Sequence, residues 1–143
     1  MHFNTLMIQP MRDELTQAGI KELLTAADVD QFMSEKSGTA MLLINSVCGC
    51  AAGMARPGVR LALQQNPRPD RLATVFAGQD LDATARARSY FAEIPPSSPS
   101  LALFKDGELI YFLPRHSIEG KDAESVAREL RNVFNEHCAV SMA

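Results

Sequence analysis

The sequence contains no tryptophan, and aromatic residues make up only 6% of the chain. It therefore offers no evident stacking platforms for nucleic-acid bases or sugars. An excess of either charge is also missing, since 14 Lys and Arg stand against 17 Asp and Glu, for a formal net charge of −3. The basic residues are scattered along the chain, so we expect no nucleic-acid partner.

Long apolar runs and a cysteine-rich pattern are absent as well. The chain has 143 residues and three cysteines, too few for a disulfide framework, and no apolar run approaches the roughly 18 residues of a membrane-spanning helix. No charged start is followed by an apolar signal segment. We therefore expect one domain, residues 1–143, in a soluble cytoplasmic protein with reduced thiols and no membrane partner.

The clearest positive pattern is an apolar run that stops just before two cysteines. A buried strand is predicted over Thr39–Ile44, because a short apolar run bounded by polar residues is typical of a strand covered on both faces. Small and apolar residues over Ala51–Leu63 then favour an α-helix that Pro57 would kink. Cys48 and Cys50 therefore lie at a strand-to-helix junction.

That junction suits thiol chemistry. The first turn of a helix has unpaired N–H groups and a partial positive charge, which lower the pKa of a thiol from the ~8.5 of free cysteine. Gly49 leaves room to close a small ring, and a strained, easily reduced Cys48–Cys50 disulfide is possible. The alternative is that Cys48 and Cys50 are two buried small hydrophobic residues.

The remaining elements predict an α/β fold in three layers. Further helices are expected over Asn4–Ala18, Ala26–Lys36, Asp80–Ala92 and Asp122–His137, and further strands over Leu72–Ala77, Ser100–Phe104 and Leu109–Leu113. This order predicts a mixed central sheet that joins a parallel β-α-β half to an antiparallel β-β-α half, after an N-terminal helical extension.

Three local signals set the ends of these elements. Thr25 and Asp28 have the spacing of a helix-capping pair, with Asp in place of Glu. Gly19 suits the left-handed position just past the end of the first helix. The dipeptide at 106–107, Asp-Gly, marks a tight turn between the last two strands.

Four separated stretches carry a further pattern. They are Asn45–Gly53 with Ala55–Pro57, then Val75–Asp80, then Pro96–Ser100, and finally Pro114–His116 with Ile118–Gly120. In this order they resemble the signature stretches of the bacilliredoxin family, thioredoxin-like proteins with Cys-Gly-Cys in place of Cys-x-x-Cys. The resemblance covers almost the whole chain and implies a thioredoxin-like fold and thiol–disulfide exchange.

The resemblance also implies roles for single residues. Cys48 would attack, and Cys50 would resolve the mixed disulfide that forms. Although most X-Pro bonds are trans, the bond before Pro99 is expected to be cis, beside the cysteines. The backbone of Ser98 would then be extended and able to pair with a substrate chain.

Arg56, Arg115 and His116 are the candidate cations near the thiols. Each is either an ordinary surface residue or a group that binds the carboxylates of a small thiol or holds the Cys48 thiolate. Cys138 follows the last helix, where partial negative charge disfavours a thiolate. We expect it to be an ordinary exposed or half-buried thiol, with a secondary redox site as the alternative.

The expected function is that of a thiol–disulfide oxidoreductase that removes bacillithiol from capped protein cysteines. Its partners would be S-thiolated or disulfide-bonded proteins and a low-molecular-weight thiol, with bacillithiol as co-substrate and no bound cofactor. One alternative is a general protein disulfide isomerase or reductase. Another is a metal or iron–sulfur carrier that uses Cys48, Cys50 and Cys138, although the sequence contains no zinc-type cluster of ligands.

Overall fold

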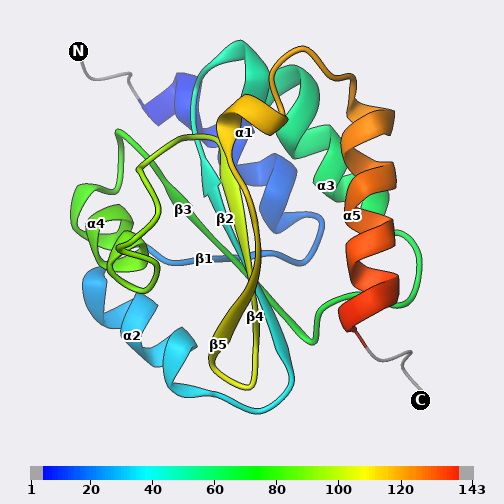
Figure 1. Cartoon of the computed structure of the whole chain (residues 1–143). Coiled ribbons are helices and arrows are strands. Elements are labelled where there is room, and N and C mark those ends of the chain that lie inside the picture. Colours follow the sequence, from blue (N-terminus) through cyan, green and yellow to red (C-terminus); the bar gives the residue numbers. More distant parts are fainter. Residues whose placement is uncertain (1–4, 139–143) are drawn as a thin grey trace.

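A five-stranded mixed sheet forms the middle of the molecule (Figure 1). The computed structural model describes residues 5–138. The spatial order of the strands is β1-β3-β2-β4-β5; β3 pairs in parallel with β1 and β2, while β4 pairs antiparallel with β2 and β5. The strands are β1 Lys21–Glu22, β2 Thr39–Asn45, β3 Arg71–Phe76, β4 Ser100–Lys105 and β5 Glu108–Leu113. The predicted mixed α/β sheet is confirmed.

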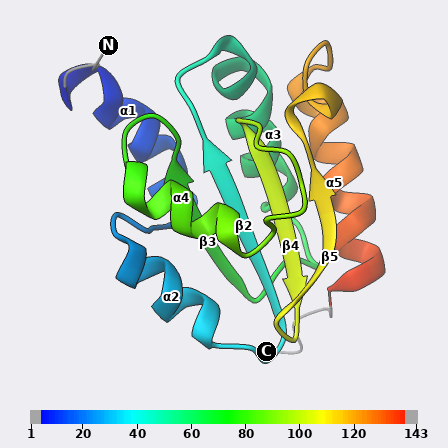
Figure 2. The same cartoon turned by 60° about the vertical axis from the view of Figure 1, so that its left-hand side comes forward.

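Helices cover both faces of this sheet. They are α1 Thr5–Thr16, α2 Ala26–Ser34, α3 Arg56–Ala62, α4 Leu81–Ser89 and α5 Ala123–His137. Figures 1 and 2 show α2 and α4 together on one face and α3 and α5 on the other. Because side chains alternate along a strand, Met41 and Leu43 pack into the core under α3 and α5, whereas Leu42 and Ile44 pack into the core under α2 and α4.

The local signals in the sequence act as predicted. The Thr25 side chain accepts from the Asp28 N–H, and the Asp28 carboxylate accepts from the Thr25 N–H, which completes the capping box of α2. Gly19 has a φ of +87° and follows the end of α1. Asp106 and Gly107 both have positive φ and link β4 to β5, as a two-residue hairpin of the mirror-image type requires.

Two expectations need correction. Strand β1 is absent from the prediction because two residues are too short to produce an alternating pattern. The expected kinked α-helix over Ala51–Leu63 is instead a π-helical turn over Ala51–Ala55 followed by α3. Pro57 is the second residue of α3, which comes directly after the π-helical turn.

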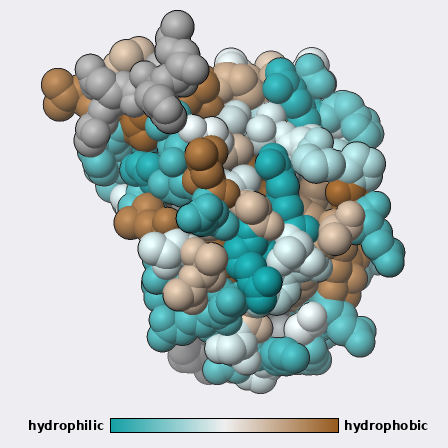
Figure 3. Space-filling model, turned by 90° about the vertical axis from the view of Figure 1, so that its left-hand side faces the viewer, coloured by the Kyte–Doolittle hydropathy of each residue, from teal (hydrophilic) through white to brown (hydrophobic). Residues whose placement is uncertain are grey.

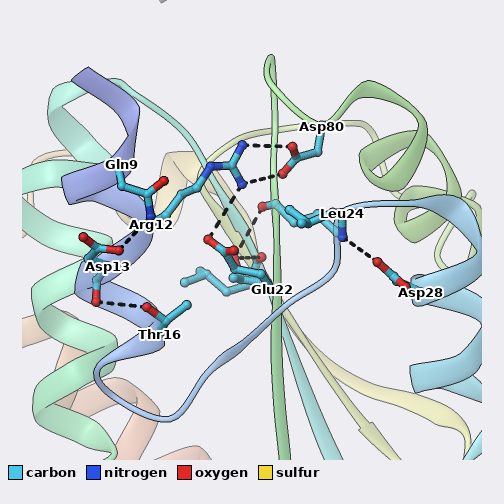
Figure 4. Close-up of polar contacts among 11 residues, drawn as sticks. Gln9, Arg12, Asp13, Thr16, Glu22, Leu24, Asp28 and Asp80 are labelled. Carbon is cyan, nitrogen blue, oxygen red and sulfur yellow. Dashed lines mark hydrogen bonds and ion pairs between the residues drawn. The ribbon is translucent and has the colours of Figure 1, made fainter. Parts of the chain in front are cut away.

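Helix α1 precedes the sheet strands in the chain and is tied to the sheet by a charged side chain (Figure 4). The Arg12 guanidinium donates two hydrogen bonds of 2.9 Å to the Asp80 carboxylate, just before α4. It also lies 3.8 Å from Glu22 on β1 and stacks over the Phe76 ring. On the inner side of α1, Leu15 is fully buried. The N-terminal helix is therefore an integral part of the packed fold.

The surface is mixed in character. On the face in Figure 3, hydrophobic side chains form separate patches among hydrophilic ones. Among the residues that the structure describes, the large apolar side chains that are half or more exposed are Leu6, Met7, Leu24 and Leu81. Within residues 5–138, no helix combines the length and apolar character needed to cross a membrane.

Candidate active site

Cys48 and Cys50 lie in the short connection between β2 and the π-helical turn, as the sequence predicts. Both are free thiols and both are partly exposed. The Cys48 carbonyl accepts from the N–H groups of Ala51 and Ala52, which begins the helical turn. Cys50 itself has helical backbone angles and packs at the margin of the core beneath α3 and α5. Cys48 therefore lies before the helical turn, and Cys50 is the residue that caps its N-terminus.

The surroundings of Cys48 favour its ionised form. Partial burial raises the pKa of the thiol, whereas the side chain of Ser46 and the backbone N–H groups of Ala51 and Cys50 lower it. The positive charge of Arg115 acts in the same direction. The net result is a pKa of Cys48 below that of an ordinary thiol. Ser46 Oγ lies 3.1 Å from Cys48 Sγ.

Gly49 is exposed between the two cysteines. A Cβ at this position would meet no atom within 4 Å, and its φ is outside the left-handed region. While both cysteines are reduced, a larger residue would therefore fit at position 49 without a clash. Any requirement for Gly49 would arise when the ring between Cys48 and Cys50 closes.

Arg115 joins the cysteine segment to the loop before β4. Its Nη2 lies 4.0 Å from Cys50 Sγ, and its Nη1 donates to the Ser98 carbonyl at 3.3 Å. Its backbone N–H donates to Ser97 Oγ at 3.2 Å, and its Nε lies 3.7 Å from Glu119. The side chain is partly exposed, so one guanidinium faces both a thiol and the solvent.

The Ser98–Pro99 peptide bond is cis, the geometry expected from the resemblance. Pro99 is buried, and Ser98 is partly exposed. The Ser98 carbonyl accepts from Arg115, which connects this segment to the one that carries Cys50. His116 follows Arg115 in the short turn Arg115–Ser117 and is exposed.

The expectation that Arg56 is a surface cation needs correction. Its side chain is only 2% exposed. Its Nε donates to Glu14 at 3.1 Å, and its Nη1 donates to Asn45 Oδ1 at 2.9 Å and to the Ser46 carbonyl at 2.7 Å. A guanidinium enclosed in this way cannot receive the carboxylate of an incoming thiol. The local sequence does not reveal this burial, because Glu14 is 42 residues away along the chain.

Cys138 is buried, not exposed, and lies far from the pair. Burial raises the pKa of its thiol, the nearby Asp70 carboxylate also raises it, and the Thr39 side chain and the Lys105 charge lower it only partly. Thr39 begins β2 and Cys48 follows the end of β2, so the two sites are about 20 Å apart along the strand. A carrier that binds one metal ion through all three cysteines is incompatible with this separation.

Metal-ligand geometry gives the same result in the region from 5 to 138, where no three His, Cys, Asp or Glu side chains gather in a group that could hold a metal ion. Ser46 is a site residue that was not predicted from the sequence, because a serine after a strand is an ordinary strand terminator. Its position two residues before Cys48 was the available signal.

The architecture is that of the thioredoxin fold, with two thiols after the central strand. A thioredoxin of Fasciola hepatica superposes with a TM-score of 0.58, covering 82% of this chain and 99% of its own, at 20% identity. Mitochondrial thioredoxin 3 of Saccharomyces cerevisiae gives a TM-score of 0.56 over 86% and 98%, at 18% identity. These likenesses define the protein as one with a thioredoxin fold.

Sequence relatives narrow the class further. The model of a family described as disulphide isomerase matches residues 3–138. A bacilliredoxin of Halalkalibacterium halodurans is 52% identical over 96% of this chain and 98% of its own length. A bacilliredoxin of Shouchella clausii is 53% identical over 92% and 91%. The chain therefore belongs to the bacilliredoxin family, and its fold and family support a thiol–disulfide oxidoreductase-like function.

Proposed function

We propose that the protein removes bacillithiol from S-bacillithiolated protein cysteines through Cys48 and Cys50. The observation that carries this proposal is the environment of Cys48, a partly exposed sulfur with a lowered pKa and a second thiol two residues away. A thiolate that is both ionised and accessible is the attacking group in thiol–disulfide exchange. The choice of bacillithiol as the specific thiol is our inference from membership of the bacilliredoxin family.

In the first step, the Cys48 thiolate attacks the bacillithiol sulfur of the mixed disulfide. The S–S bond breaks, its electron pair leaves with the client cysteine, and that thiolate takes up a proton. The cap is then joined to Cys48 by a new S–S bond. No bound organic cofactor is needed, because both electrons stay within the sulfur atoms.

In the second step, the Cys50 thiolate attacks the Cys48 sulfur and releases bacillithiol. This leaves a Cys48–Cys50 disulfide, which an external thiol reductant must return to two thiols. Alternatively, a second bacillithiol attacks the cap, so that bacillithiol disulfide leaves and Cys48 is regenerated. Gly49 would permit the closure of the small ring on the first route.

The remaining site residues would recognise the substrate. Arg115 lies between Cys50 and Ser98, where its guanidinium would meet carboxylates of the cap. His116 lies beside it on an exposed turn and would add positive charge when protonated. The extended backbone at Ser98, before cis-Pro99, would pair with the client chain. We propose a cytoplasmic location, where thiols are kept reduced as this cycle requires.

A second candidate is a general protein disulfide isomerase or reductase, which the description of the matching family favours. The two functions differ in their substrates. The test uses one small protein in two forms, with a single cysteine capped by bacillithiol or with an intramolecular disulfide, and follows reduction of each by intact mass. We expect the capped form to react faster. Equal or faster reduction of the intramolecular disulfide would favour the second candidate.

A further inference from the structure

Arg56 is a buried cation in the middle of the redox region. With 2% of its surface exposed, its charge has to be balanced by partners inside the protein. Glu14 on α1 supplies a carboxylate at 3.1 Å and is itself 31% exposed. Asn45 and Ser46, at the end of β2, supply the other two acceptors. One side chain on α3 therefore holds the N-terminal helix and the end of the central strand together.

These contacts fix Ser46 from both sides. Its N–H donates to Asn45 Oδ1 at 2.9 Å, and its carbonyl accepts from Arg56 at 2.7 Å. Arg56 also donates to the same Asn45 Oδ1, which sets the direction of that amide. These bonds hold both peptide groups of Ser46, and its hydroxyl lies 3.1 Å from Cys48 Sγ.

The hydrogen bond between Ser46 and Cys48 has a defined direction once Cys48 is ionised. A thiolate has no proton to donate, so the Ser46 hydroxyl must be the donor. Such a bond stabilises the thiolate more than the thiol. Arg56 bonds the Ser46 carbonyl directly, so it acts on the Cys48 thiolate through the position of Ser46.

We propose that Ser46 is a catalytic residue that donates a hydrogen bond to the Cys48 thiolate, and that Arg56 and Glu14 are positioning residues that act through it. Helix α1 thereby becomes part of the active site, because the Glu14 carboxylate is one of the groups that hold Arg56 in place. The inference deepens the proposed function and rests on it in one respect, since it takes Cys48 as the attacking thiol.

The test measures the rate at which iodoacetamide alkylates Cys48 as a function of pH, in a Cys50→Ser background, with peptide mapping to separate Cys48 from Cys138. We expect Ser46→Ala to slow alkylation at pH 7 about tenfold, the loss expected for one hydrogen bond to a charged group. The pH profile of alkylation should move to higher pH, because the thiolate loses a stabilising hydrogen bond. Arg56→Lys should move it in the same direction, because an ammonium keeps the charge but not the forked geometry.

Glu14→Gln gives the sharpest comparison, because loss of charge and loss of positioning predict opposite shifts in the pH profile of Cys48 alkylation. Loss of a negative charge by itself would stabilise the Cys48 thiolate and move the profile downward. Loss of positioning would move it upward. Asp13→Asn, on the same turn of α1, removes the same charge without touching Arg56 and measures the charge effect alone. Arg12→Gln loosens the other anchor of α1 (Figure 4) and controls for general loosening of the helix.

The proposal is supported if the alkylation profile moves to higher pH in Glu14→Gln but not in Asp13→Asn or Arg12→Gln. If Arg56→Lys folds, as shown by circular dichroism, and leaves the profile unchanged, the positioning role of Arg56 is refuted. If Arg56→Lys does not fold, identical profiles for Glu14→Gln and Asp13→Asn would overturn the role instead. A Cys48 that titrates like a free thiol in the parent variant would contradict the proposed function itself.

Discussion

The guanidinium of Arg115 lies within reach of the second thiol, with Nη2 at 4.0 Å from Cys50 Sγ. The same side chain bonds the Ser98 carbonyl, and its charge helps to lower the pKa of Cys48. Arg115 thus contacts both Cys50 and Ser98, the residue before the cis-proline. Its charge also acts on Cys48, which can be tested by removing that charge.

Replacing Arg115 by Gln should slow alkylation of Cys48 at pH 7 by about two- to fivefold, the range expected for one partly exposed charge. The loss should shrink as salt is added, because ions screen the charge in the parent protein. Alkylation followed by intact mass at low and high salt measures both effects. Lys105→Gln, at the far end of β4, is the matched control. Equal rates for the two variants would count against a role for Arg115.

Cys138 should react far more slowly than Cys48 in the folded protein. It is 7% exposed and burial raises the pKa of its thiol, so both access and ionisation are reduced. Peptide mapping after brief alkylation should find label on Cys48 well before Cys138, and denaturant should remove the difference. Cys138→Ala should keep the parental rate of cap removal. A large loss of activity in that variant would restore a redox role for Cys138.

Helix α3 approaches α5 so closely at Gly58 that no side chain fits. A Cβ there would lie 2.7 Å from the nearest atom of Val126 and 3.1 Å from the Ala123 carbonyl oxygen. Gly58→Ala should therefore lower the free energy of unfolding by about 1–3 kcal/mol. Gly53→Ala is the control, since a Cβ at that position meets nothing within 4 Å. Urea unfolding of both variants measures the difference, and equal stabilities would contradict the packing described.

Glu129 on α5 should make the protein more stable at neutral than at acid pH. Burial raises the pKa of its carboxyl, but the Tyr111 hydroxyl and Lys121 lower it below the ordinary value. For a carboxyl with a lowered pKa, the stabilisation is complete above the unfolded value of about 4.3 and disappears as the pH falls through the folded value.

The measurement compares the free energies of unfolding of the parent and Glu129→Gln between pH 3 and pH 7. We expect a difference of about 1 kcal/mol at neutral pH, the size typical of a half-exposed pair, and none at the acid end. Glu136→Gln, an exposed change on the same helix, should show little difference at any pH. A gap between parent and Glu129→Gln that persists unchanged at pH 3 would contradict this account.

The sequence predicts those features that depend on neighbours along the chain. The apolar run of β2, the capping box of Thr25 and the Asp106-Gly107 turn each depend on residues within a few positions, and all three are confirmed. Strand β1 was missed because its two residues owe their extended pairing to β3, far along the chain. Local sequence carries little information about such a strand.

Some residues of the candidate site can likewise be predicted from their neighbours in the chain, and others cannot. The position of Cys48 and Cys50 at the start of a helical turn follows from the local pattern, and it is confirmed. The burial of Arg56 does not follow from that pattern, because an arginine is buried only where acceptors from other elements surround it, here Glu14 and Asn45. The contact of Ser46 with the thiol combines a local spacing of two residues with the bond from Arg56 that holds the Ser46 carbonyl.

The most direct test of the central claim is to find which sulfur takes the cap. Reduced Cys50→Ser and Cys48→Ser variants are each mixed with a test protein capped by bacillithiol, and intact mass with peptide mapping locates the cap. The account predicts that Cys50→Ser retains the cap on Cys48, while Cys48→Ser leaves the test protein capped. Transfer of the cap to Cys48→Ser at the rate of the parent protein would contradict the assignment of Cys48 as the attacking thiol.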